Sequence, residues 1–256
     1  MRDRSRRFLC MIILIAASGV GLALPVRGAG PSFRFGLAFD YLSRRITWDQ
    51  KARESDFTAS LVTGRAEVAV EPWLSLTVMA GLSLADFNGL VFRNLPISLD
   101  YEGGAVSGIA AGAEVRADLL RSGDFEIQGS GRFVSSFGLS KTLPLEGFAV
   151  AGTASGKPAW MMASAGPRFS YLFFGKFVPY VSVEANWLWG DFRMTESLAD
   201  LAGTEKKAIR GKSFVEAAVG AEFTLGKRLL LKGRAGFLPY AGGTDAEASL
   251  AIFYMF

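Results

Sequence analysis

The segment Glu247-Ala-Ser-Leu-Ala-Ile-Phe-Tyr-Met-Phe256 decides how the rest of the chain is interpreted. It alternates along its length, and Leu250, Ile252, Tyr254 and Phe256 share one parity, so they lie on one face of a β-strand. In a soluble sheet this strand would leave an exposed apolar edge, which natural sheets avoid. In a closed barrel within a membrane, the same strand would complete the ring.

The same period of two runs through the chain after residue 30, in about ten segments. One face of each segment carries almost no charge, with small and aliphatic residues in the middle and aromatics toward the ends. The other face mixes small residues with charges that can pair. This distribution is typical of a membrane barrel, whereas a two-sheet sandwich needs large apolar residues to fill its core. The segments are 33–41, 62–70, 74–84, 109–118, 125–133, 163–173, 181–189, 215–225, 231–237 and 247–256.

The connectors between these segments alternate in length. Those at 71–73, 120–124, 174–177 and 226–228 are short, and those at 47–57, 87–104, 138–158 and 191–212 are long. Short periplasmic turns and long extracellular loops are typical of outer-membrane barrels, so both termini are expected in the periplasm. We therefore predict an all-β fold, a closed antiparallel transmembrane β-barrel of about ten strands, with eight or twelve as alternatives. Pro167 lies inside the sixth segment, where it predicts a bulge or a different strand limit.

The first 28 residues have the pattern of a secretory signal peptide. Four arginines precede the apolar run 8–24, and a short polar exit follows it. The alternative is an anchoring helix, although a run of about 17 residues is near the lower limit for spanning a membrane. Cleavage between residues 28 and 30 leaves a barrel domain at 29–256 with equal numbers of basic and acidic residues. This charge balance gives no electrostatic reason to expect nucleic-acid binding. The only cysteine, Cys10, precedes the cleavage site, so the barrel domain contains none.

Through the signal peptide, the ten alternating segments and the terminal Tyr254-Met255-Phe256, the chain resembles the bacterial outer-membrane β-barrel superfamily. The resemblance implies an integral, monomeric protein of the Gram-negative outer membrane, in contact with outer-membrane lipid and lipopolysaccharide. It also implies delivery by periplasmic chaperones and recognition of Phe256 by the barrel-assembly machinery. The resemblance is architectural, so it indicates a fold and a location rather than an activity.

The chain contains no histidine, which is the usual general base near neutral pH. The enzymes of the barrel superfamily depend on a histidine, which this chain lacks. Glu114 and Asp118 could form a hydrolytic pair, but Arg116 shares their face and is expected to neutralise them. With no histidine, no cysteine in the barrel and no calcium-loop motif, we predict no catalytic residue, no metal site and no cofactor.

Fifteen charged residues are predicted to face the lumen, seven basic and eight acidic. A barrel of this size has an interior that side chains nearly fill. We therefore predict that the charges pair as a hydrogen-bonded plug, because unpaired charges would carry a desolvation penalty. The alternative is a narrow solute path, although a selective pore would show one sign in excess. The residues are Arg34, Asp40, Arg65, Glu67, Glu114, Arg116, Asp118, Glu126, Arg132, Arg168, Glu184, Glu216, Glu222, Lys232 and Arg234.

Aromatic residues near the predicted strand ends are expected to anchor the barrel at the membrane interfaces. A site that stacks carbohydrate or lipid is the alternative, and Trp48, in the first predicted loop, fits a girdle less easily. The predicted anchors are Trp73, Phe125, Phe173, Trp187, Trp189, Phe223 and Tyr254.

Two of the predicted loops have unusual compositions. The loop at 87–104 is apolar enough to fold inward, pack on the rim or meet a partner. The loop at 191–212 carries Lys206, Lys207, Arg210 and Lys212, a cluster that either contacts lipopolysaccharide phosphates or is simply solvated. We predict a structural, adhesive or surface-interaction role through such loops. A narrow porin-like channel is the second reading, and a membrane-embedded hydrolase is the third.

Overall fold

The computed structural model describes residues 32–48, 53–145 and 151–256, and every regular element in these ranges is a β-strand. Within them no helix has the length and hydropathy that crossing a membrane requires. The chain divides into residues 1–30 and 31–256, and all described strands belong to the second unit. The predicted signal peptide and its cleavage site lie outside the described residues.

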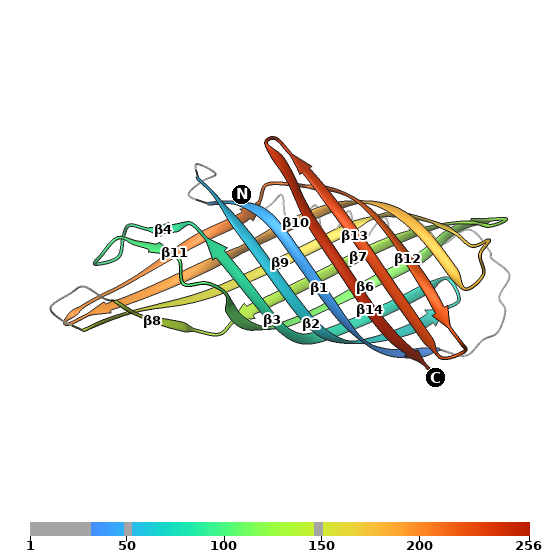
Figure 1. Cartoon of the computed structure of the whole chain (residues 1–256), viewed down its shortest axis with the longest axis horizontal. Coiled ribbons are helices and arrows are strands. Elements are labelled where there is room, and N and C mark those ends of the chain that lie inside the picture. Colours follow the sequence, from blue (N-terminus) through green and yellow to red (C-terminus); the bar gives the residue numbers. More distant parts are fainter. Residues whose placement is uncertain (1–31, 49–52, 146–150) are drawn as a thin grey trace. The chain divides into compact units, whose positions relative to one another are not determined.

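Ten strands pair antiparallel in the order β10-β12-β13-β14-β1-β2-β3-β6-β7-β9, and β9 pairs in turn with β10. The pairings therefore follow a ring of about ten strands (Figure 1). Each ring strand covers one predicted segment, except that β9 ends before Phe173 and β14 before Phe256. The bounds are β1 Phe33–Trp48, β2 Arg53–Glu71, β3 Leu74–Asn88, β6 Val106–Ser122, β7 Phe125–Gly138, β9 Gly152–Tyr171, β10 Phe177–Leu198, β12 Val215–Leu225, β13 Leu229–Tyr240 and β14 Gly243–Met255.

The terminal strand pairs with the first one, as its parity predicts. The β1–β14 register places Arg34 opposite Met255 and Ser43 opposite Ala246. Beyond the end of β14, the backbone N–H of Phe256 donates to the carbonyl of Phe33 at 3.4 Å.

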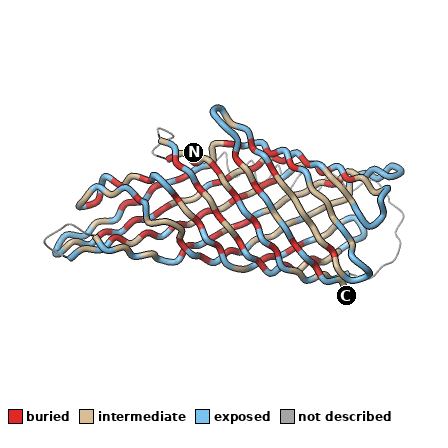
Figure 2. Tube along the Cα trace, viewed as in Figure 1, coloured by how far each residue is buried: buried red, intermediate tan, exposed pale blue. Residues whose placement is uncertain are grey.

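The ring strands expose apolar side chains and bury charged ones. Leu37, Leu82 and Leu250 are 63%, 69% and 63% exposed, whereas Asp40 and Glu216 are buried. Buried and exposed residues alternate along parts of most ring strands, as in β1 and β2 (Figure 2). Soluble proteins do the reverse, because ionised side chains are rarely buried and large apolar side chains gain from leaving water. An apolar exterior around a polar interior is the arrangement of membrane barrels.

Three of the four segments predicted as long loops are largely strand over their described residues, so their prediction as loops was wrong. Residues 47–57 belong mostly to β1 and β2, and 191–212 form the outer part of β10 and most of a hairpin with β11 (Leu201–Gly211). Residues 138–158 include β8 (Lys141–Leu145) and the start of β9. Outside the ring, the apolar side chains of these strands lie on the inward face instead of the outward one: Phe192 is buried while Arg193 is exposed. That reversal ends the apolar-outward pattern from which the segments were predicted.

Strand β11 continues the sheet beyond the ring. β10 pairs with β12 through Ala185 and with β11 from Trp189 onward. β11 also meets β1, where Ile46 lies opposite Gly211. We call this region the extension: the outer ends of β1, β2, β9 and β10, together with β8 and β11.

Strand β9 runs straight through Pro167, so neither a bulge nor a strand end accommodates this proline. On the β7 side, Pro167 lies opposite Gly129 in unbroken register. On the β10 side, the pairs at residues 166 and 167 are missing from the ladder, while the register is the same before and after the gap. Proline has no N–H to donate, and the interrupted ladder needs none at this point.

Candidate functional site

The interior of the ring holds a network of ion pairs, of which one centre is Asp40 of β1. Arg65 of β2 contacts one carboxylate oxygen of Asp40 at 2.6 Å, and Arg132 of β7 contacts the other at 3.1 Å. All three side chains are largely excluded from solvent. Two guanidinium groups thus hold one buried carboxylate from two sides of the lumen.

A second centre crosses the lumen between strands that do not pair. Arg116 of β6 lies between Glu114, at 2.9 Å, and Glu222 of β12, at 3.0 Å. Glu222 also accepts Arg168 of β9 at 2.8 Å. The Arg168 guanidinium lies 3.6 Å from the ring centroid of Tyr180, a cation–π contact.

Three further carboxylates occupy the third part of the network. Arg234 contacts Glu184 and Glu216, each at 2.9 Å. Glu67 accepts Lys232 at 2.6 Å and Arg34 at 2.8 Å. The structure therefore brings most of the predicted lumen residues together as ion pairs.

Two of the predicted lumen residues stand apart from the ion pairs. Asp118 accepts a hydrogen bond from the amide of Gln128 at 2.7 Å. Glu126, near the short-turn end, has no ion-pair partner among the described residues.

Sequence reasoning missed Arg44, Asp245 and Glu247, which join the network from the side of the extension. Fully buried Arg44 contacts Glu247 at 2.8 Å and Asp245 at 3.3 Å. Asn186 links them further, accepting from Arg44 at 3.0 Å and donating to Glu216 at 2.8 Å. The signal was present, since Arg44 has the parity of Asp40 and Glu247 lies on the polar face of the terminal segment. The first predicted segment ended at residue 41, before Arg44, and the last one began at residue 247, after Asp245.

Little space remains between the charged side chains. A cavity of about 80 Å³ lies among them, lined by Arg65, Glu114, Arg132, Arg168 and Lys232 with several hydroxyl groups. This volume holds only a few water molecules.

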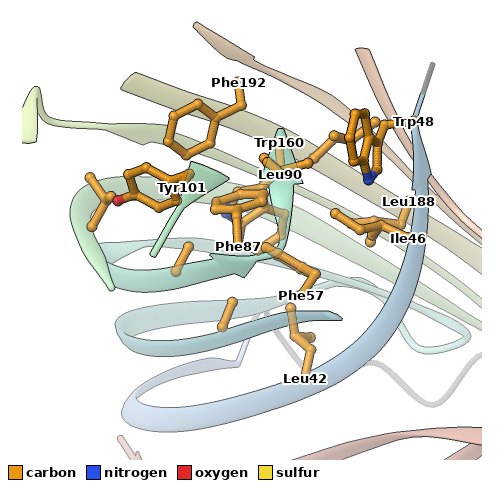
Figure 3. Close-up of a cluster of buried hydrophobic side chains, with 14 of the residues drawn as sticks. Leu42, Ile46, Trp48, Phe57, Phe87, Leu90, Tyr101, Trp160, Leu188 and Phe192 are labelled. Carbon is orange, nitrogen blue, oxygen red and sulfur yellow. The ribbon is translucent and has the colours of Figure 1, made fainter. Parts of the chain in front are cut away.

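A second layer, made of large apolar side chains, fills the interior on the side of the extension (Figure 3). The ring of Phe57 lies 4.9 Å from that of Phe87 and 5.4 Å from that of Trp160. Phe87 in turn contacts Phe192 at 5.3 Å. These residues come from β2, β3, β9 and β10, and each is buried. We call this set, with its buried neighbours, the apolar core.

The apolar loop at 87–104 packs inward onto this core. It forms a small hairpin of β4 (Leu90–Phe92) and β5 (Leu99–Tyr101). Phe92 and Tyr101 lie 5.7 Å and 4.7 Å from the Phe192 ring, and Leu90 is fully buried. The high apolar content of this loop is explained by these contacts.

Trp48 belongs to the apolar core and not to a girdle. Its indole N–H donates to Ser55 at 2.8 Å, and the cationic groups of Arg53 and Lys207 lie 5.3 Å and 5.2 Å from its ring. Lys207 also contacts Glu205 at 2.8 Å in the interior.

The basic residues predicted as one cluster in the 191–212 loop are split between two faces, so the prediction of a single cluster was wrong. Lys207 is buried, Lys206 points outward to Asp191 at 3.1 Å, and Lys212 contacts Glu54 at 2.6 Å. The split follows from strand geometry, because successive side chains point to opposite faces.

The predicted interface aromatics lie outward at two levels. Trp187 and Trp189 occupy the extension side of β10, while Phe177 marks the short-turn end of the same strand. Twelve residues at about 3.3 Å each, tilted by about 40°, separate Phe177 and Trp189 by roughly 30 Å along the barrel axis. That span matches an apolar band with a girdle at each side. The predicted aromatics at or near the short turns are Trp73, Phe125, Phe173, Phe223 and Tyr254.

The two carboxylates considered as a hydrolytic pair both have partners, Arg116 for Glu114 and Gln128 for Asp118. Among the described residues, no three acidic side chains gather as a metal site would require.

No protein-family model and no curated protein matches the chain. Solved structures do match the chain. The translocator domain of the autotransporter NalP from Neisseria meningitidis is 14% identical, with a TM-score of 0.46, over 100% of this chain and 98% of that one. The transport unit of the autotransporter AIDA-I from Escherichia coli is 13% identical, with a TM-score of 0.44, over 96% and 97%. The outer membrane protease OmpT from Escherichia coli is 11% identical, with a TM-score of 0.45, over 93% and 100%.

The predicted all-β fold is confirmed by the described strands, and these outer-membrane β-barrels are what the chain is similar to. At these identities and TM-scores the similarity concerns the fold class alone. The chain's own ion pairs and apolar core determine what its interior can do.

Proposed function

We propose that the chain is an integral outer-membrane protein, a closed ten-stranded barrel whose lumen is sealed and whose extension acts at the cell surface. The observation that carries this proposal is the double filling of the interior, by paired charges and then by the apolar core. The extension would face the outside, because the short turns gather at the opposite end.

The outer surface supports membrane insertion. Large side chains such as Leu37, Val62 and Leu82 are about half or more exposed on neighbouring strands. At roughly 25 cal/mol per Å², exposing so many apolar side chains to water would be very costly, whereas lipid accepts them. The aromatic levels described above lie at the expected separation.

The interior supports a sealed lumen. Ions and small polar solutes need a continuous hydrated path, and a region lined by apolar side chains excludes water. Here Phe57 contacts Phe87, and Phe87 contacts Phe192, so these side chains occupy the space that such a path would need. The paired charges beneath them leave only the small cavity.

The extension supports the proposed surface role. Its strands present polar residues outward, such as Thr195 and Thr204, which hydrogen-bond each other at 3.2 Å. A rigid sheet beyond the bilayer offers partners a fixed surface. We therefore favour a structural, adhesive or surface-interaction role over transport or hydrolysis.

The test is conductance in planar bilayers, together with heat-modifiable gel migration. A sealed barrel shows no steady channels, and the unheated protein migrates differently from the boiled one. Steady single-channel currents from the unaltered protein would favour the narrow channel instead. Identical migration with and without boiling would contradict the membrane barrel itself.

A further inference from the structure

Three basic side chains form a line across neighbouring strands on the outer face of the extension. In the β9–β10 register Arg193 lies opposite Lys157, and in the β10–β11 register it lies opposite Lys206. All three are exposed. We call Lys157, Arg193 and Lys206 the basic row.

This arrangement is unfavourable by itself. Directly opposed residues have Cβ atoms about 5 Å apart, and like charges at that distance destabilise a sheet. Asp191 is the only carboxylate on the outward face of these three strand segments, and it contacts Lys206 alone at 3.1 Å. Lys157 and Arg193 have no ion pair among the described residues. The row thus carries excess positive charge that the protein does not neutralise.

The level of the row relative to the apolar band identifies what could neutralise it. Arg193 follows Trp189 by four residues on β10. At about 3.3 Å per residue and a tilt of about 40°, this places the row roughly 10 Å beyond the upper aromatic level. The polar headgroup region extends about 5–8 Å beyond the hydrocarbon on each side. The backbone of the row therefore lies about 2–5 Å outside the headgroups, and its long lysine and arginine side chains can reach back to them.

We propose that the basic row binds phosphate groups of an outer-leaflet lipid, which in a Gram-negative outer membrane is lipopolysaccharide. This inference rests on the proposed membrane location and orientation. The arginine can hold a phosphate through two parallel N–H bonds, and the flanking lysines add point charges. Hydroxyl groups of Ser155 and Thr195 lie on the same face, where each hydrogen-bonds a neighbouring hydroxyl group, that of Ser140 at 2.7 Å and that of Thr204 at 3.2 Å.

The experiment measures binding of the purified barrel to vesicles that contain phosphorylated lipid A or its dephosphorylated form. It compares the unaltered protein with K157Q/R193Q and with the control K176Q/K227Q. The control removes the same charge from exposed residues at the short-turn end. We expect K157Q/R193Q to bind the phosphorylated lipid about thirty-fold more weakly, from two charges near a membrane surface. The control and the unaltered protein should bind alike.

Stability provides an independent readout with an expected change of sign. In detergent without phosphorylated lipid, K157Q/R193Q should be at least as stable as the unaltered protein, because like-charge repulsion is relieved. With phosphorylated lipid A added, it should be the less stable of the two, because ligand binding stabilises the folded state of the unaltered protein.

Three results would overturn the inference. They are equal affinity for the dephosphorylated lipid, unchanged binding by K157Q/R193Q, and displacement of the lipid by millimolar inorganic phosphate, which would indicate a site for the free ion. Preference for an acidic peptide over the phosphorylated lipid would likewise overturn it, in favour of a protein partner. A barrel that inserts but shows no preference defeats only this inference, whereas one that enters no vesicle contradicts the proposed function as well.

Discussion

At the scale of single residues, a buried ion pair affects stability mainly when one partner is removed and the other charge stays buried. A buried charge whose partner is removed remains desolvated without compensation, which costs more than the pair itself contributes. Arg44 and its sequence neighbour Arg45 provide a comparison between a buried ion pair and a solvent-exposed one. Arg44 is fully buried against Glu247 and Asp245, whereas Arg45 pairs with exposed Asp56 at 3.0 Å.

We expect R44A to lower the free energy of unfolding by about 3–5 kcal/mol, because two carboxylates lose their buried partner. The matched variant R45A should lower it by about 1 kcal/mol or less, since its pair is exposed to solvent. Denaturant unfolding in lipid vesicles or detergent measures both. Similar losses for the two variants would show that the Arg44 contacts are not buried in the folded protein.

The buried phenol of Tyr101 predicts a pH dependence in the extension. Burial, helped by the Asp86 carboxylate, raises the pKa of Tyr101 to about 12. An unfolded tyrosine has a pKa near 10. Between about pH 10 and 12 the unfolded chain therefore loses this proton while the folded chain keeps it, so stability falls as pH rises.

The free energy of unfolding is expected to fall by up to about 2 kcal/mol over that interval, since one pKa unit corresponds to about 1.4 kcal/mol, and this fall should be absent in Y101F. The difference between the two proteins is the quantity to measure, because it isolates the contribution of Tyr101. Parallel unfolding curves at pH 8 and pH 11 provide it. A constant difference between the proteins at both pH values would contradict a raised pKa.

At the scale of strands, sequence alone predicted the ten ring strands but not their lengths. The ring portions are easily recognised because apolar residues face outward and the alternation is strong, as in Phe33 to Tyr41. Beyond Tyr41 the apolar residues change parity, with Leu42 and Ile46 inside. A search for one apolar face therefore stops at the change, and the apolar core, which depends on Phe57, Trp160 and Phe192 meeting from distant strands, could not be found from local pattern.

Aqueous thiol labelling can locate this change along one strand. The only native cysteine, Cys10, precedes the predicted cleavage site, so each introduced cysteine is the single target in the barrel domain. Val183 and Thr195 share the outward face of β10, one inside the apolar band and one beyond it. In intact vesicles we expect a membrane-impermeant maleimide to modify T195C and to leave V183C almost unmodified.

The control for accessibility is the same reaction after denaturation, when both variants should react fully. Equal labelling of V183C and T195C in the folded protein would place the apolar band in water and contradict the membrane assignment.

At the scale of the whole molecule, the proposed seal of the lumen consists of two interior layers of different kinds. The charged layer is held by ion pairs across the lumen, and the apolar core by contacts among aromatic rings. Because they lie in series, loss of one leaves the other in place. A channel should open only when both are removed.

We expect deletion of the β4–β5 hairpin with F57S and F192S to yield no steady conductance, and E114A/R116A alone to yield none either. The combined variant should conduct, and planar-bilayer recording distinguishes the three. Heat-modifiable migration of each variant checks that the barrel still forms. Conductance from either set of changes alone would show that the other layer does not close the lumen.

In the proposed membrane location, the change of parity along the strands also fixes how deep the protein can sit. On β10, Trp189 and Asp191 are adjacent residues of the outward face. Sinking the barrel by one residue pair would carry Asp191 into hydrocarbon, and raising it by the same step would lift Trp189 into water. Equivalent boundaries on β1 and β3, between Tyr41 and Ser43 and between Leu84 and Asp86, impose the same limit from other sides of the ring. Vertical position is therefore encoded strand by strand, and a bilayer of a different thickness would have to adapt to the protein.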